Sequence, residues 1–211
     1  MPQTSQTFVL GISGASGAPY ALRLLEQLLS RGHCVHLVVS DYGRRLLFDE
    51  AAIRNLTLEE LVPSLGKDAD SRRRLIIHPN KDVGAIIASG SFLHQGMVVL
   101  PCSSASLGQM ATGSGSNLLC RAAMVTLKEH RPLVICHREM PLNLIDIRNM
   151  ETLALAGATI CSPNPGFYLM PKRVEDLVDF VVGKALDLLK VEHDLKVRWS
   201  PAHGPGTNGD E

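Results

Sequence analysis

Short apolar runs alternate with longer helix-like segments along this chain, and the alternation is the strongest constraint on its fold. The strand-like runs lie at about 7–12, 34–39, 97–101, 132–137 and 158–161. The helix-like segments lie at about 18–31, 41–50, 117–130, 143–156 and 173–190. Alternation of this kind, with continuously apolar strands, predicts a parallel sheet that is covered on both faces. We therefore expect an α/β fold, a three-layer α/β/α Rossmann-like (flavodoxin-like) parallel sheet in a single domain.

The length of 211 residues suffices for one well-buried α/β domain, and no Pro- or Ser-rich linker divides the chain. We place this domain at residues 1–199. Residues 200–211 are rich in Gly and Pro and cannot bury a core, so a disordered C-terminal tail is expected there. Segment 51–96 is less regular, and its run of arginines at 72–74 is typical of a solvated basic face.

The charge balance argues against partners that bind through a general positive field. Lys and Arg number 21, as do Asp and Glu, so the formal net charge is zero. We expect no nucleic-acid and no membrane partner, and any anion site must be local. Because the N-terminus lacks the layout of a signal peptide and no apolar run is long enough to span a bilayer, a cytoplasmic protein is expected.

The five cysteines, Cys34, Cys102, Cys120, Cys136 and Cys161, are odd in number and lack CxxC spacing. Most lie in apolar runs, so the pattern favours buried free thiols over a redox or zinc role, and we expect no metal. Cys102 is the exception to watch, because it lies at the start of a polar loop.

The segment VLGISGASGAPY at 9–20 runs from an apolar strand through small residues straight into a helix. Small residues let the backbone approach an anion closely, and the helix start presents unpaired N–H groups and a positive dipole end. The glycines at 11, 14 and 17 are three apart and do not fit GxGxxG, which favours a mononucleotide or flavin over a dinucleotide. Taken alone, the turn fits a tight strand–helix connection equally well.

Three further loops that follow strands contain hydroxyl or charged side chains, at 40–41 (SD), 103–106 (SSAS) and 138–141 (REMP). Ligands bind such a sheet outside the carboxyl ends of its strands, where these loops should gather. Together, their hydroxyls and helix-start amides predict a local phosphate site. Singly, Ser40 and Ser103 are explained as helix N-caps.

Several charged side chains and one phenol are candidates for binding an anion. Arg121 and Lys128 are seven residues apart on one helix face, although two solvated bases are the alternative. Arg138 offers bidentate contacts to phosphate, and Glu139 beside it is suited to proton transfer. The Pro-flanked loop at 163–171 would hold a tyrosine phenol in one place.

In chain order, the segments GISGASGAPY, ASGSF, PCS, RAA, LKE, REMP and GFY resemble the UbiX flavin prenyltransferase family, from about residue 8 to 199. The resemblance implies a flavodoxin-like homo-oligomer, usually a dodecamer, with FMN at the subunit boundary. It implies an enzyme that joins reduced FMN to dimethylallyl monophosphate at flavin N5 and C6, without metal. The product, prenylated FMN, would serve a UbiD-type decarboxylase.

The resemblance also assigns roles to individual residues. The FMN contacts of the family match Gly14, Ala15, Ser16, Ser40, Ser103, Ser104, Ala105, Ser106 and Arg138. The positions around the prenyl phosphate match Arg121, Lys128, Arg138, Tyr168 and Lys184. Ser16 with Glu50 matches a pair near flavin N5, and Glu139 matches a carboxylate that transfers protons, so these three are the expected catalytic residues.

Three positions depart from better-known members of the family. Lys184 stands where many have Arg, so a point charge would replace a planar fork. Val83 stands where some have Trp, which removes an aromatic wall. Met124 replaces a common Asp, for which we have no physical account.

Two other functions match the sequence less well. A flavin-dependent cysteine decarboxylase relative would need an Asn in the loop at 101–106, which has none, and a Pro-x-Met-Asn motif, which MPLN at 140–143 does not match. A non-catalytic FMN-binding accessory subunit of an aromatic-acid decarboxylase would not need the second anion site that Arg121, Lys128 and Tyr168 suggest.

Overall fold

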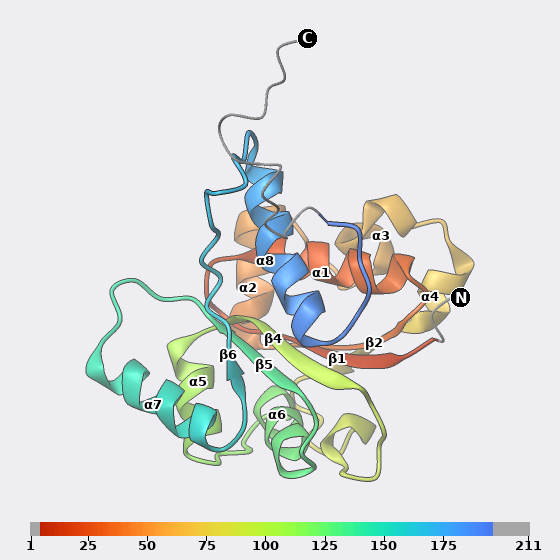
Figure 1. Cartoon of the computed structure of the whole chain (residues 1–211). Helices are drawn as coiled ribbons and strands as arrows, with labels where there is room; N and C mark the ends of the chain where they lie inside the picture. Colours follow the sequence, from red (N-terminus) through yellow and green to blue (C-terminus); the bar gives the residue numbers. More distant parts are fainter. Residues whose placement is uncertain (1–4, 196–211) are drawn as a thin grey trace.

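The computed structural model describes residues 5–195, which build one sheet of six parallel strands in the order β3-β2-β1-β4-β5-β6 (Figure 1). The strands are β1 (Thr7–Ile12), β2 (Cys34–Val39), β3 (Leu75–Pro79), β4 (Gly96–Cys102), β5 (Leu133–His137) and β6 (Thr159–Ile160). The predicted Rossmann-like parallel sheet is thereby confirmed. The expected tail at 200–211 and the domain end at 199 lie outside the described residues.

Helices cover both faces of the sheet (Figure 1). One face carries α1 (Ala18–Ser30), α2 (Asp41–Ala51), α3 (Leu58–Leu61), α4 (Ala69–Arg74) and α8 (Val174–Leu188). The other carries α5 (Ser104–Ala111), α6 (Leu118–Lys128) and α7 (Leu144–Leu155). The core forms two buried clusters, one on each side of the sheet, because strand side chains alternate between the faces. No helix within residues 5–195 is long and apolar enough to cross a bilayer.

The expected elements agree with the observed ones within about two residues, but the irregular segment and one loop contain elements that the pattern missed. Segment 51–96 contains α3, α4, the edge strand β3 and two 3-10 turns, at Pro63–Leu65 and Ile86–Ala88. The loop expected at 103–106 instead begins α5, which spans Ser104–Ala111. The arginines at 72–74 end α4 and pair with acidic side chains, as expected of a solvated face.

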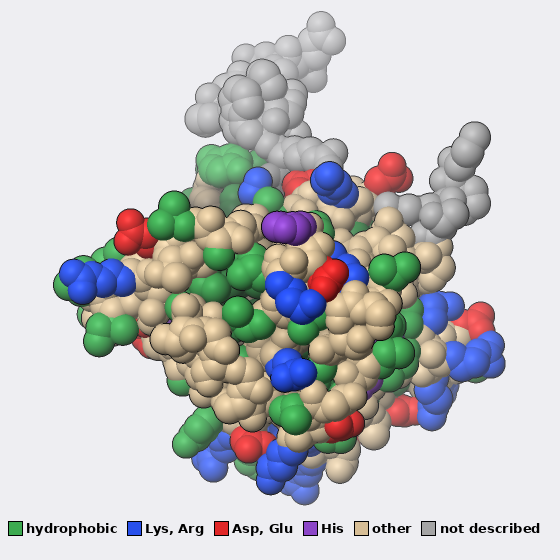
Figure 2. Space-filling view, turned by 90° about the horizontal axis from the view of Figure 1, so that it is seen from below, with side chains coloured by type: hydrophobic (Ala, Val, Ile, Leu, Met, Phe, Trp, Pro, Cys, Tyr) green, Lys and Arg blue, Asp and Glu red, His purple; other side chains and the backbone are tan. Residues whose placement is uncertain are grey.

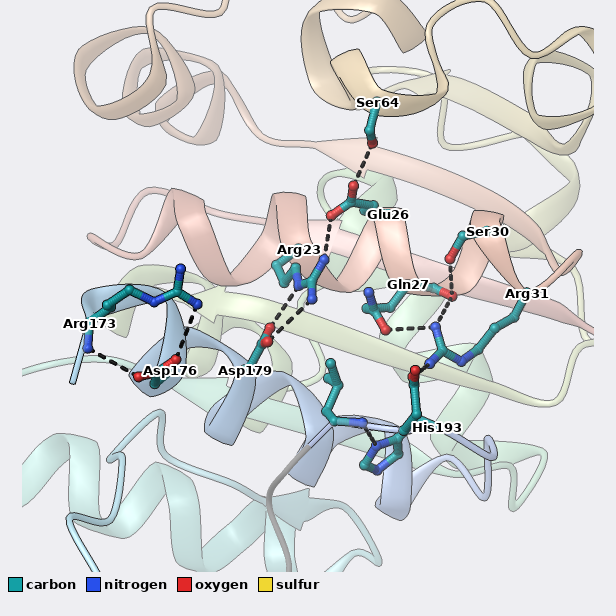
Figure 3. Close-up of polar contacts among 12 residues, drawn as sticks. Arg23, Glu26, Gln27, Ser30, Arg31, Ser64, Arg173, Asp176, Asp179 and His193 are labelled. Carbon is teal, nitrogen blue, oxygen red and sulfur yellow. Dashed lines mark hydrogen bonds and ion pairs between the residues drawn. The ribbon is translucent and has the colours of Figure 1, made fainter. Parts of the chain in front are cut away.

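An arginine on α1 ties α8 to the rest of its layer (Figure 3). Arg23 donates to both oxygens of Asp179 on α8, at 2.7 and 3.2 Å, and to Glu26 at 2.7 Å. Two parallel N–H···O bonds between planar groups fix orientation as well as distance. The position of α8 matters because this helix carries Lys184.

A histidine of β2 contacts a histidine of β3. Nδ1 of His36 is 2.8 Å from Nε2 of His78, and Phe92 packs on the His36 ring. Burial, then the neighbouring His78 and His94, lower the pKa of His36 to about 4. The folded state therefore favours the neutral imidazole.

We predict that His36 alone lowers the free energy of unfolding by about 2 kcal/mol as the pH drops from 6.5 to 4, because His36 binds a proton in the unfolded chain and stays neutral in the folded one. Denaturant unfolding across this range should show a shallower fall for His36→Asn. His130→Asn, at an exposed histidine, is the matched control and should keep the wild-type slope. Equal slopes for His36→Asn and wild type would contradict the assignment.

Candidate functional site

The strand order reverses between β1 and β4, and the loops after these two strands meet at that point. Ser13, fully buried, donates its hydroxyl to the carbonyl oxygen of Pro101 at 3.0 Å and accepts from the backbone N–H of Ser103 at 2.7 Å. The N–H of Ser40 donates to the carbonyl oxygen of Ile12, and the N–H of Arg138 donates to that of Cys102. These backbone hydrogen bonds join the loops after β2 and β5 to the loops after β1 and β4. The four loops predicted to gather at one sheet edge therefore do so, at a place where such folds bind ligands.

A carboxylate caps the start of α1. The sequence had indicated unpaired backbone amides there. Glu50, near the end of α2, accepts from the N–H groups of Gly17 and Ala18 at 3.0 and 2.9 Å. That expectation was wrong for these two amides, because a residue 32 positions further on caps the helix. The cap adds negative charge at the positive end of the helix dipole.

Glu50 also contacts Ser16, as the family resemblance implies. Partial burial acts to raise the pKa of Glu50, but hydrogen bonds from Ser16, Gly17 and Ala18 and the charge of Arg138 outweigh it and lower the pKa. Glu50 is thus held as a carboxylate.

The serines of the other loops act first as helix caps. Ser40 accepts from the N–H of Gly43 at 3.0 Å to cap α2, and Ser103 accepts from Ser106 at 3.3 Å to cap α5. The N-cap interpretation is correct for both. Ser104 differs, because its hydroxyl oxygen is buried and has no hydrogen-bond partner within residues 5–195. An unsatisfied buried hydroxyl is unusual and indicates a group that a ligand would complete.

The Gly-rich turn lies against the start of α2. A Cβ added at Gly14 would approach Cβ of Tyr42 to 2.4 Å, so a side chain at this position requires a backbone shift. Ala15 is buried, whereas Gly14, Ser16 and Ala105 are exposed. Together with Ser104, the exposed turn fits the approach of a polar ligand such as FMN to the backbone.

Arg138 and Glu139 lie directly beyond β5, beside the Gly-rich turn. Nε of Arg138 donates to the carbonyl oxygen of Ser16 at 3.2 Å, and its Nη1 lies 3.9 Å from Oε1 of Glu139. Both side chains remain more than one third exposed, at 38% and 39%. The fold of a single chain therefore brings four predicted site residues together: Ser16, Glu50, Arg138 and Glu139.

Tyr168 and Lys184 form a second group with α8. The ring of Tyr168 stands edge-on to Phe180 at 5.6 Å, and Lys184 follows Phe180 by one helical turn. A Cβ at Gly166 would come within 2.7 Å of the Tyr168 ring, which explains the glycine there. Tyr168 is 51% exposed, and Lys184 is exposed as well.

Arg121 and Lys128 lie on α6, and the structure does not bring Lys128 to the other cations. Nζ of Lys128 is 2.5 Å from Glu129 and lies next to Gly90, at the amino end of the sheet. Arg138 follows the carboxyl end of β5, and a strand of this length spans roughly 16 Å. Arg121 is exposed near the start of α6, and within residues 5–195 its side chain has no ion pair.

The sequence analysis did not identify two further residues near the site. His137 and Asp146 are buried below the loop at 138–141, with Nε2 and Oδ1 3.9 Å apart. Nδ1 of His137 is 3.0 Å from the carbonyl oxygen of Cys102. Position 137 directly before REMP was the available clue. In residues 5–195, no group of three His, Cys, Asp or Glu side chains is arranged to hold a metal ion.

Comparison with known proteins places this chain among flavoproteins. The Flavoprotein family model matches residues 2–186. A flavin prenyltransferase UbiX of Halalkalibacterium halodurans is 44% identical over 192 residues, covering 91% of this chain and 92% of the relative. A crystal structure of AnUbiX (PadA1) in complex with FMN and dimethylallyl pyrophosphate is 33% identical with a TM-score of 0.80, covering 93% and 98%. A dodecameric FMN-dependent UbiX-like decarboxylase from Escherichia coli O157:H7 is 35% identical with a TM-score of 0.81, covering 92% and 99%.

We predict that Glu50→Gln lowers the free energy of unfolding at pH 7 by about 0.5 to 1 kcal/mol, a modest loss because the position is exposed and screened. A carboxylate with a lowered pKa stabilises the fold above the ordinary pKa, near 4.5, and this contribution disappears as the pH falls through the folded pKa. Denaturant unfolding should therefore show the two proteins converging near pH 3. Asp49→Asn, on the same helix but in a surface pair with Arg45, should change stability less at either pH.

Proposed function

Since the chain belongs to the Flavoprotein family, and within it to the UbiX flavin prenyltransferases, we propose that it joins a dimethylallyl phosphate to reduced FMN at the edge of the sheet where β1 and β4 diverge. The bonds would form at flavin N5 and C6, and inorganic phosphate would leave. The observation that carries this assignment is the gathering of Ser16, Glu50, Arg138 and Glu139 in one place.

The FMN site would be built from Gly14, Ala15, Ser16, Ser40, the serine loop Ser103, Ser104, Ala105 and Ser106, and Arg138. The unsatisfied hydroxyl of Ser104 and the exposed backbone at Gly14 support this placement. Arg138 supplies the positive charge for a phosphate, because the start of α1 is already occupied by Glu50. FMN when bound supplies the electron-rich ring that is alkylated.

The prenyl phosphate would be held by Arg121, Lys128, Arg138, Tyr168 and Lys184. A departing phosphate gains negative charge, which cationic and phenolic donors stabilise more strongly than they stabilise the bound substrate. Tyr168 packs on Phe180 of α8, the helix that carries Lys184, and both Tyr168 and Lys184 are exposed, so both are accessible to an incoming anion. Lys184 would do so as a point charge.

Glu139 would move the proton that ring closure releases, and Ser16 with Glu50 would form the pair near N5. The exposed Glu139 carboxylate is 3.9 Å from Arg138, so it is near the phosphate arginine and still available. Glu50 is engaged with two backbone amides and with Ser16, which suits it to orienting that hydroxyl.

A homo-oligomer, with a dodecamer as the expected size, would complete the site. Lys128 lies at the opposite end of the sheet from Arg138, which supports a site that takes Lys128 from a second copy. Apolar side chains on and before α7 reach the surface and offer a contact for that copy: Met140, Leu142, Leu144, Ile145, Ile147 and Leu155. Figure 2 shows the face over α5, α6 and α7, with hydrophobic side chains at the surface toward the α7 end. Exposed apolar patches commonly mark interaction sites.

The product would pass to a UbiD-type decarboxylase, and the five free thiols fit the reducing cytoplasm as the compartment. We propose the monophosphate as donor. The related AnUbiX (PadA1) was solved with the pyrophosphate, so both donors belong in the test.

Anaerobic incubation with reduced FMN and dimethylallyl monophosphate should give a flavin heavier by one C5H8 unit in mass spectrometry of the released cofactor. Glu139→Gln should still bind FMN, while single-turnover formation of the product slows by about 100-fold, because proton transfer is lost. Glu175→Gln, an exposed carboxylate on α8, should react at the wild-type rate.

Unmodified FMN from wild-type protein that binds it well, with either donor, would favour the accessory-subunit function. An unchanged rate in Glu139→Gln would remove only the proton-transfer role of that residue.

Mixed oligomers test the shared site directly. Lys128→Ala and Arg138→Ala should each abolish turnover when assembled alone. If each site takes Lys128 from one copy and Arg138 from another, random assembly of equal amounts restores both residues at about one quarter of the sites. No recovery in demonstrated mixed oligomers would place both residues in one subunit's site or outside it.

A further inference from the structure

Two cysteines lie opposite each other on neighbouring strands at the edge of the site. Ile135 of β5 pairs with Ile160 of β6, and the N–H of Cys161 donates to the carbonyl oxygen of Ile135 at 2.9 Å. The ladder therefore continues by one residue and sets Cys161 beside Cys136. Neighbouring strands lie about 4.8 Å apart, within the Cα separation of about 4.4 to 6.8 Å that a disulfide bridges.

The side chains of both cysteines belong to the same side of the sheet. Cys136 is part of the buried cluster under α1 and α8, and Cys161 packs against that cluster. Cys136 is fully buried, whereas Cys161 is partly exposed. Cys161 is thus the more accessible residue of the two.

The two thiols are also unequal in acidity. The hydrogen bond from Cys136 lowers the pKa of Cys161, partial burial opposes the change, and the ammonium of Lys184 lowers the pKa further. The same hydrogen bond and then burial raise the pKa of Cys136. Cys161 is therefore the more acidic thiol of the pair.

The other three cysteines lack this combination. Burial raises the pKa of Cys34, Cys102 and Cys120. Cys102, which the sequence analysis singled out, is fully buried. The expectation of buried thiols is correct for Cys102, Cys120 and Cys136 and wrong for Cys34 and Cys161, which are partly exposed.

We propose that Cys136 and Cys161 form an oxidation site, in which a peroxide attacks through Cys161 and Cys136 closes an intramolecular disulfide. The thiolate of Cys161 takes one oxygen from hydrogen peroxide and hydroxide leaves, which gives a sulfenic acid. The thiol of Cys136 then attacks this sulfur, the S–S bond forms and water leaves. Two thiols are oxidised, and one peroxide is reduced to two waters.

The disulfide would remove the negative charge that faces Lys184. Any effect on turnover rests on the proposed function, because it acts through the prenyl phosphate site. The thiol chemistry itself does not, and it is measured without flavin or prenyl phosphate.

The experiment treats the reduced full-length protein with hydrogen peroxide and follows intact mass and peptide maps. Wild type should lose two hydrogens and yield a linked Cys136–Cys161 peptide pair. Cys136→Ser should instead gain one oxygen at Cys161, since the resolving thiol is absent. Cys161→Ser should give neither product, and Cys34→Ser, at the other partly exposed thiol, should behave as wild type.

Alkylation by iodoacetamide gives an independent readout of the thiolate. At pH 7, Cys161 should react about tenfold faster than Cys34, and its rate should rise at a lower pH than that of an ordinary cysteine, near 8.5. A disulfide between other cysteines, no linked pair in wild type, or equal alkylation of Cys34 and Cys161 would overturn the proposal. The wild-type peptide map decides the matter even if the Cys136 variant does not fold.

Discussion

The hydroxyl of Ser13 joins the two halves of the sheet at the point on which the site depends. In a doubly wound sheet the connections leave β1 and β4 toward opposite faces, so the loops after these strands tend to separate. A fully buried hydroxyl that donates to Pro101 and accepts from Ser103 keeps them together. The Gly-rich turn and the serine loop can then act on one ligand, and neither loop has to be long or mobile to do so.

The fold was predictable because its strands are continuous apolar runs and its long helices are amphipathic. β3 was missed because it is an edge strand with only partly buried side chains, and α5 because its serines resemble a loop. The site loops were predictable in position, since parallel strands deliver them to one edge. Their contacts were not: the carboxylate of Glu50 at the start of α1 depends on how α1 and α2 pack, which no local pattern records.

The helices that begin at the site are capped in two different ways. α1 begins against a built-in carboxylate, and α2 and α5 begin against their own serines. The proposed flavin site would therefore rely on Arg138 and on an unsatisfied group, the hydroxyl of Ser104. The starts of α1, α2 and α5 are thus satisfied by side chains of the protein itself.

The location of Lys128 at the far end of the sheet from Arg138 has a consequence for the proposed shared site. A subunit whose own pocket is intact would depend on the surface of its neighbour, so specific activity would fall with dilution once the assembly dissociates. A substitution on α6 and one beyond β5 would then affect sites in different copies, and an inactive subunit would impair sites that are not its own.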